Sequence, residues 1–247
     1  MKNIFLLFVF AVMSLHAGKI RIACAANVSY AIAPLVEAFK LEHPETNIEL
    51  ILGSSGKLTA QIKHGAPYDL FLSANMRYPQ ALYEADMSLD KPRLYAQGAL
   101  ALLSVKARQN WHALTVLQSP EIKKIAIANP KTAPYGVATV EALKNAGVYE
   151  TLKDKFVYGE SISQTIIYAT TAADIGIVAK SSLYAPQMLK YKQGIHWSDV
   201  DERLYAPIDQ GMIMLKQAEA NAEVKAFYDF MLSAKAKEIL RSFGYKV

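Results

Sequence analysis

The chain has 247 residues, of which 52% are hydrophobic and 20% charged, and its formal net charge is +5 at pH 7. These values are ordinary for a folded protein of one large or two smaller domains, and they argue against widespread disorder. The basic residues are scattered along the sequence, which argues against a nucleic-acid-binding patch and leaves a mild positive field that attracts small anions.

The N-terminus has the pattern of a secretory signal peptide. Lys2 gives a positive start, residues 4–12 form an unbroken apolar run, and residues 14–17 end on a small residue before charged sequence. The run is too short to span a bilayer. We therefore expect a signal peptide at 1–17, cleaved after Ala17, and a soluble mature protein in the periplasm.

Cys24 is the only cysteine, so the chain has no internal disulfide and no thiolate metal cluster. Arg21 lies three residues before it and the apolar run ends well upstream, which argues against a lipid-modified cysteine. Because Cys24 lies in an apolar segment, we expect it to be a small buried core residue.

Short apolar runs alternate with helical periodicity along the rest of the chain. The expected strands are 20–26, 48–52, 70–72, 99–105, 125–128, 156–157, 175–178 and 212–215. The expected helices are 31–39, 58–62, 139–146, 163–170, 224–232 and one around 239–240. This alternation indicates an α/β fold with βαβ units and a mostly parallel sheet.

The length and the order of these elements fit two α/β lobes. We expect residues 18–98 with 211–247 to form lobe 1 and residues 99–210 to form lobe 2. The chain then crosses between the lobes twice, near 97–98 and near 206–211. A cleft between lobes joined by two crossovers can close on a small ligand by hinge bending.

The sequence contains no recognisable catalytic motif. His43, His64, His112 and His196 lie outside any familiar catalytic context, and there is no nucleophile elbow, paired zinc histidine or Walker loop. A periplasmic enzyme acting on a small anionic substrate stays open as an alternative. It would need a base beside Ser55 or Asn27, and the sequence shows none.

Four segments place small or uncharged polar residues where a strand ends and a helix begins. They are residues 25–27, 53–56, 133–136 and 160–163. Ligands of open α/β sheets bind beyond the carboxyl ends of strands, where helix N-termini present N–H groups and a favourable dipole to anions. Since each expected lobe supplies two of these segments, together they can surround one tetrahedral dianion.

The candidate ligand groups are all neutral. They are the Ser55 hydroxyl, the Asn27 side-chain amide and the backbone N–H groups of Asn27, Ser55, Tyr135 and Ile162, with Ala26, Ser54 and Ser163 as secondary candidates. Neutral donors hold a dianion without a buried ion pair whose desolvation cancels the gain. We expect no cofactor and no metal coordinated directly by side chains.

Asp69, Glu160 and Asp174 would repel a dianion, so we expect them to cap helices or accept backbone N–H bonds. Trp111 and Trp197 are expected to pack in the fold.

A set of short stretches recurs in a characteristic order along the chain, at 25–27, 53–62, 65–74, 128–130, 133–136, 159–164, 173–178 and 226–230. In combination and order, these stretches resemble the periplasmic molybdate-binding proteins of ABC importers, over essentially the whole mature sequence. The resemblance implies a two-lobed periplasmic-binding-protein fold, with molybdate or tungstate held in the cleft by hydrogen bonds alone. It also implies a membrane permease and a cytoplasmic ATPase as partners.

By position, the family's two binding serines correspond to Asn27 and Ser55, and its backbone donors to Tyr135 and Ile162. A binding tyrosine frequent in the family falls on Ala179, which has no hydroxyl. The Tyr135 phenol and the Ser163 hydroxyl are the candidates to replace that bond.

The sequence thus favours a monomeric, non-enzymatic binder of molybdate or tungstate. Sulfate and phosphate are the alternative ligands. Sulfate is smaller than molybdate, so the size of the cavity decides between these two anions. Phosphate can carry a proton, and its recognition commonly needs a carboxylate that accepts this proton.

Overall fold

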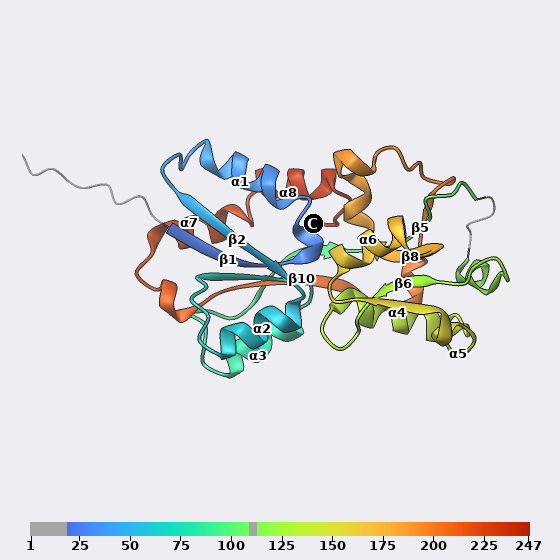
Figure 1. Ribbon diagram of the computed structural model, residues 1–247. Coiled ribbons are helices and arrows are strands. Elements are labelled where there is room, and N and C mark those ends of the chain that lie inside the picture. The colour runs from blue at the N-terminus through green and yellow to red at the C-terminus, as the bar shows by residue number, and fades with distance from the viewer. Residues whose placement is uncertain (1–18, 109–112) are drawn as a thin grey trace, which may run out of the picture.

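The computed structural model describes residues 19–108 and 113–247. The signal peptide expected at 1–17 and the packing expected of Trp111 lie outside the described residues. Within the described residues the chain forms two α/β lobes, each built on a five-stranded sheet and lying side by side (Figure 1). No helix in these described ranges is long and apolar enough to cross a bilayer.

The sheet of lobe 1 has the strand order β2-β1-β3-β10-β4. Its strands are β1 (Lys19–Ala25), β2 (Asn47–Gly53), β3 (Leu70–Ser73), β4 (Arg93–Gly98) and β10 (Ile208–Met214). Helices α1 (Ile32–Lys40), α7 (Ala222–Phe230) and α8 (Ala234–Ser242) cover one face, and α2 (Ser55–Lys63) and α3 (Arg77–Glu84) cover the other (Figure 1). Lobe 1 is therefore a three-layer α/β/α unit.

Alternation along the strands explains why both faces of this sheet are covered. Ile22 and Cys24 pack in the core under α1, α7 and α8, whereas Ala23 between them packs under α2 and α3. Successive strand side chains point to opposite faces, so an unbroken apolar strand needs a helix layer on each side. Cys24 is fully buried, as the sequence predicts.

The sheet of lobe 2 has the strand order β7-β6-β8-β5-β9. Its strands are β5 (Leu100–Leu103), β6 (Ile125–Ala128), β7 (Phe156–Gly159), β8 (Ile175–Ala179) and β9 (Trp197–Asp199), and its helices are α4 (Pro134–Asn145), α5 (Tyr149–Leu152) and α6 (Ile162–Thr171). Leu102 and Ile127 face the core under α4, and Ala126 and Val178 face the core under α6. Trp197 is buried in the α6-side core, as expected.

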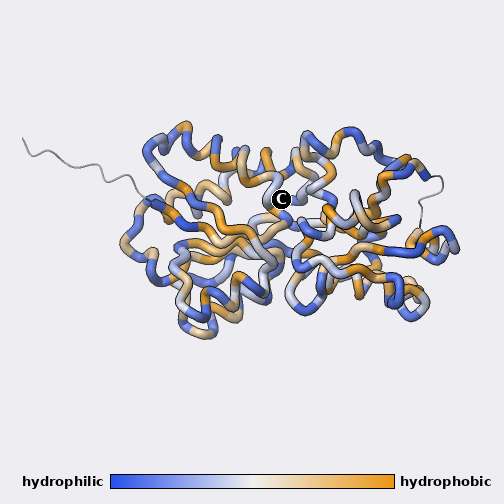
Figure 2. Tube along the Cα trace, viewed as in Figure 1, coloured by the Kyte–Doolittle hydropathy of each residue, from blue (hydrophilic) through white to orange (hydrophobic). Residues whose placement is uncertain are grey.

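Short 3-10 helices complete the chain. They are η1 (Ala26–Val28), η2 (Leu114–Gln118), η3 (Lys153–Lys155), η4 (Lys180–Tyr184), η5 (Pro186–Met188), η6 (Glu202–Leu204) and η7 (Lys216–Ala218). The apolar stretches gather on the strands inside each lobe, and polar stretches lie on the outer helices and loops (Figure 2).

Each sheet is mostly parallel, as expected, because four of its five strands run in one direction, but each also contains one antiparallel strand. In lobe 1, β1 runs parallel to β2 and β3, but β10 runs antiparallel to β3 and β4. In lobe 2, β5 is likewise antiparallel to β8 and β9. The reason is topological. Both β10 and β5 enter their sheets from the other lobe rather than through a helical βαβ crossover, so the parallel rule does not apply to them.

The two crossings lie at the ends of these strands. β4 ends at Gly98 and β5 begins at Leu100, so the first crossing is a single residue long. The second crossing leads from β9 into β10, and Ile208, Asp209 and Gln210 pair with β4 in the sheet of lobe 1. The sequence expectation placed these three residues in lobe 2.

Gly176 in β8 fixes how closely α6 approaches the sheet of lobe 2. A Cβ at Gly176 would lie 2.3 Å from the Cβ of Ala169 on α6. We expect Gly176→Ala to lower the free energy of unfolding by about 1–3 kcal/mol, because the helix must move away from the strand. Urea unfolding of the ligand-free protein measures this loss.

The control is Gly176→Ala combined with Ala169→Gly, which removes the opposing Cβ. The double variant should lose less stability than the sum of the two single changes. Strict additivity would show that the close approach does not limit the helix position.

Candidate functional site

Four elements begin at one place between the lobes. In lobe 1, η1 follows β1 and α2 follows β2, and in lobe 2, α4 follows the β6 loop and α6 follows β7. Their first residues line one cavity, formed by Ala25, Ala26, Asn27, Gly53, Ser54, Ser55, Ala74, Ala133, Pro134, Tyr135 and Ile162. The fold therefore brings together all four primary candidates of the sequence, with Ala26 and Ser54. Ser163 is one residue beyond the lining.

Among the described residues that line this cavity, none carries a charge. The cavity is small, about 10 Å³, which is roughly the space that the centre of one water molecule needs. Hydrogen bonds from Gly56 to Thr132 and from Ser163 to Ala26 join the two lobes, which are closed on each other. Across residues 19–108 and 113–247, no group of three or more His, Cys, Asp or Glu side chains gathers in a way that could hold a metal ion.

Ser55 is held in place by a main-chain donor. Its Oγ accepts a hydrogen bond from the Ala74 N–H at 2.9 Å, and the side chain is 1% exposed. A serine hydroxyl has one proton to donate besides its lone pairs. Because Ala74 occupies a lone pair, the Ser55 O–H is left to donate to a ligand.

Ser54, the residue before Ser55, brings a second hydroxyl to the lining of the cavity. It precedes α2 in an extended conformation, and its Oγ is buried with no hydrogen-bond partner in the described part of the chain. Buried hydroxyls normally have partners. Its position therefore suits a group that meets a polar ligand.

The two helices of lobe 2 present main-chain donors. Pro134 is the first residue of α4 and has no N–H, so Tyr135 carries the first N–H of that helix. At α6, the Ser161 side chain caps the helix by accepting from the Gln164 N–H. The N–H of Ile162, in the first turn, has no intrahelical acceptor. Both helix starts thus point positive dipole ends at the cavity.

Asn27 lies in η1 and is 1% exposed. Its Nδ2 donates to Oε1 of Gln210 at 2.7 Å and to the Tyr245 hydroxyl at 2.9 Å. Both protons of the amide are therefore used inside the protein. The group that Asn27 leaves for a ligand is its main-chain N–H, one of the first in η1.

The two candidates to replace the tyrosine missing at Ala179 differ in their contacts. The Ser163 hydroxyl donates to the Ala26 carbonyl at 2.9 Å, across the two lobes. The Tyr135 hydroxyl is buried beside Gly98 at the end of β4 and has no hydrogen-bond partner among the described residues. Burial, and then the neighbouring Tyr245, raise the pKa of Tyr135 well above its usual value, so the phenol stays neutral.

Two of the three carboxylates accept backbone N–H bonds, as expected. Asp69 accepts from Arg21 at 2.7 Å, and Asp174 accepts from Lys124 and Lys123, which lowers its pKa. Glu160 differs from the expectation, because it pairs with the Lys57 ammonium at 2.6 Å.

That ion pair belongs to a set of contacts between the lobes. Lys57 is on α2 of lobe 1 and Glu160 precedes α6 of lobe 2, and both side chains are more than half exposed. Next to them the Gly56 N–H donates to the Thr132 carbonyl at 2.9 Å. A Cβ at Gly56 would lie 2.9 Å from that carbonyl oxygen, so the lobes meet here backbone to backbone.

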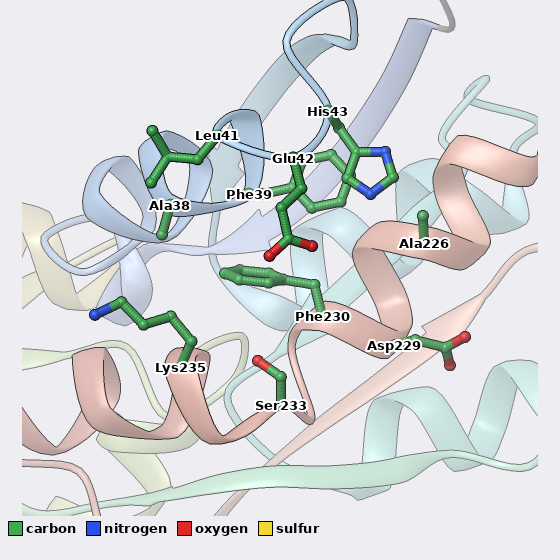
Figure 3. A pocket seen from close by; sticks show the side chains of 10 residues that line it. All are labelled: Ala38, Phe39, Leu41, Glu42, His43, Ala226, Asp229, Phe230, Ser233 and Lys235. Atoms are coloured by element: carbon green, nitrogen blue, oxygen red, sulfur yellow. The ribbon is translucent and has the colours of Figure 1, made fainter.

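A larger cavity lies away from this site, between the end of α1 and helices α7 and α8 (Figure 3). Its volume is about 530 Å³, and its walls include the rings of Phe39 and Phe230 and the carboxylates of Glu42 and Asp229. Its lining carries charged side chains of both signs, including Lys235, and lacks the convergent helix starts of the smaller cavity, so size does not make it the better candidate.

Two lobes joined by two crossings, with a cavity of helix starts between them, define a solute-binding protein of the two-lobed kind. The chain belongs to the bacterial extracellular solute-binding protein family, whose model matches residues 20–246.

Individual relatives agree with this assignment. The chain is 36% identical over 231 residues to the molybdate-binding protein ModA of Rhodobacter capsulatus, covering 93% of this chain and 88% of that protein. The solved periplasmic molybdate-binding protein of Azotobacter vinelandii has a TM-score of 0.84 and 28% identity, over 92% of this chain and 99% of that one. The sulfate-binding protein SubI of Mycobacterium tuberculosis shares the fold, with a TM-score of 0.76 and 12% identity over 92% and 86% of the chains.

The adjacent serines allow a matched test of how the site is held. We expect Ser55→Ala to lower the free energy of unfolding by about 1–3 kcal/mol, because the buried Ala74 N–H loses its acceptor. Ser54→Ala should cost close to nothing, because that hydroxyl has no partner among the described residues. Urea unfolding of both ligand-free variants measures the difference, and equal costs would contradict the assigned roles.

Proposed function

We propose that this protein binds molybdate, or tungstate, in the periplasm and delivers it to an ABC importer, acting as a monomeric carrier and not as an enzyme. The observation that carries the proposal is the cavity itself. Helix starts from both lobes and the hydroxyls of Ser54 and Ser55 converge there, and the described lining has no charged side chain. The donor groups proposed for the anion are the Ser55 hydroxyl and the main-chain N–H groups of Asn27, Ser55, Tyr135 and Ile162.

The relatives support the choice of anion. The ModA proteins of Rhodobacter capsulatus and Azotobacter vinelandii are named for molybdate binding and match almost the whole chain. The sulfate-binding relative shows that the fold alone does not select among tetrahedral anions. For phosphate, the described lining offers no carboxylate to accept the proton of a partly protonated anion.

The interlobe contacts explain how such a carrier can release its ligand. The Lys57–Glu160 pair is exposed and contributes about 0–1 kcal/mol, and the Gly56–Thr132 bond is one neutral main-chain bond. The Ser163 and Ser181 hydroxyls add two neutral hydrogen bonds across the lobes, to the carbonyls of Ala26 and Asn27. We infer that the bound dianion, by bridging donors of both lobes, adds to the free energy of closure, so that opening and release are coupled.

A direct test is isothermal titration of the purified mature protein with molybdate, tungstate, sulfate and phosphate. We expect one-to-one binding of molybdate or tungstate, with sulfate weaker by roughly 100-fold, or about 2.7 kcal/mol. A smaller anion cannot reach the donors of both lobes at once. Equal competition by sulfate would show that the proposed selectivity is wrong.

The same titration on Ser55→Ala should show a loss of about 1–3 kcal/mol of binding free energy, the usual cost of an unmade bond to a charged group. Ser88→Ala is the matched control, because Ser88 is a buried serine of lobe 1 whose hydroxyl bonds to the Asp90 carbonyl away from the cavity. Its affinity should equal that of the unaltered protein. An unchanged affinity in Ser55→Ala would remove that hydroxyl from the site.

Binding should also be insensitive to pH between about 6 and 9. Ordinary tyrosines ionise near pH 10, and burial raises the pKa of Tyr135 further, so the one ionisable side chain in the described lining stays neutral. Deprotonation would place a negative charge beside the dianion and weaken binding, but the raised pKa moves that loss above this range. Titrations at several pH values measure it, and a tenfold change within the range would contradict the all-neutral site.

A further inference from the structure

Three buried polar side chains meet behind the cavity. They are Asn27 on η1, Gln210 on β10 and Tyr245 in the C-terminal segment, and each is at most 3% exposed. Asn27 Nδ2 donates to Gln210 Oε1 at 2.7 Å and to the Tyr245 hydroxyl at 2.9 Å. These contacts join three parts of the chain that lie far apart in sequence.

Gln210 is fixed so that it can only accept from Asn27. Its Nε2 donates to the carbonyls of Ile208 at 2.8 Å and Ala74 at 3.4 Å. Carbonyl oxygens require the amide nitrogen on that side, so the Gln210 oxygen must face Asn27. The orientation of the Asn27 amide follows, with its nitrogen toward Gln210.

Tyr245 binds Asn27 at two points. Its hydroxyl accepts from Asn27 Nδ2 and donates to the Asn27 main-chain carbonyl at 2.9 Å. Ser181, on η4 of lobe 2, donates to the same carbonyl at 3.2 Å. The main chain at Asn27 is thus held from the C-terminal segment and from the opposite lobe.

The C-terminal segment is itself fastened at the first crossing. Gln97 and Lys246 exchange two main-chain hydrogen bonds, at 2.7 and 3.0 Å, beside the end of β4. The C-terminus accordingly lies near the junction of the lobes (Figure 1). The segment that carries Tyr245 is therefore hydrogen-bonded to the main chain beside the first crossing between the lobes.

We propose that Gln210 and Tyr245 are positioning residues, which hold Asn27 so that the main-chain N–H groups at the start of η1 point into the anion site. The proposal rests on the proposed function and deepens it. Neither side chain lines the cavity, and both contact Asn27, which does.

The hydroxyl of Tyr245 can be compared with that of another buried tyrosine. Tyr228 is also 3% exposed, but its hydroxyl has no hydrogen-bond partner within the described ranges. Tyr228 lies on α7, in the core of lobe 1. Tyr228→Phe therefore removes a buried hydroxyl from the same lobe without removing a contact to Asn27.

The experiment compares Tyr245→Phe with Tyr228→Phe by molybdate titration and by thermal unfolding of the ligand-free proteins. Tyr245→Phe should bind molybdate about 5- to 10-fold more weakly, the loss expected when hydrogen bonds that orient a donor are removed. Tyr228→Phe should bind like the unaltered protein. Equal affinity in Tyr245→Phe, even with a lowered unfolding temperature, would mean a structural role only and would overturn the proposal.

A double-mutant cycle with Asn27→Ala shows whether Tyr245 acts through Asn27. In the Asn27→Ala background, Tyr245→Phe should weaken binding less than it does in the unaltered protein, because only the bond from Tyr245 to the main-chain carbonyl of residue 27 is left to lose. A strictly additive effect would overturn the proposal.

A readout that needs no ligand separates this proposal from the proposed function. The side-chain amide protons of Asn27, followed by nuclear magnetic resonance in the ligand-free protein, should exchange with solvent about 10-fold faster in Tyr245→Phe. Unchanged exchange would overturn the positioning role whatever the protein binds. If the unaltered protein fails to bind molybdate while the exchange result holds, the proposed ligand is wrong and the contact to Asn27 stands.

Discussion

A doubly charged anion that leaves water must recover its lost hydration, and the proposed site offers only neutral dipoles for this. A cation in the cavity would attract the anion strongly, but burying that cation costs free energy and slows release. Neutral donors avoid this cost only if several of them reach the anion together at short distance. The site therefore depends on geometry more than on charge, and the rest of the fold serves that geometry.

The two sheets meet this requirement by directing strand ends at one point. β1 and β2 end beside each other in lobe 1, and β6 and β7 do so in lobe 2. The next element begins at once in η1, one residue later in α2, and after short loops in α4 and α6. Gly56 lets the lobes approach until main chain meets main chain.

The sequence predicted the parts of the site that depend on local signals. Small polar residues between an apolar strand and a helix marked the segments around Asn27, Ser55, Tyr135 and Ile162, and the fold brings these together. Contacts between distant segments could not be predicted in this way. Asn27 meets Gln210 and Tyr245 across 183 and 218 residues of sequence, and no local pattern indicates which way its amide turns. The antiparallel entry of β5 and β10 was missed for a similar reason, since strand direction depends on the partner and not on the strand. The short strands β4 and β9 and helix α3 were missed because their apolar patterns are brief.

The position of β10 between β3 and β4 has a consequence for how the protein folds. The strands of lobe 2 follow one another without interruption from Leu100 to Asp199, so this lobe can assemble from relatively local contacts. The sheet of lobe 1 cannot be completed until β10 is available, and β10 begins more than a hundred residues after the ends of β3 and β4. Until then the facing edges of β3 and β4 are unpaired, and unpaired edges invite pairing with other chains. Lobe 1 therefore begins first in the sequence but is completed last. Until β10 pairs, lobe 1 is the lobe at risk of aggregation.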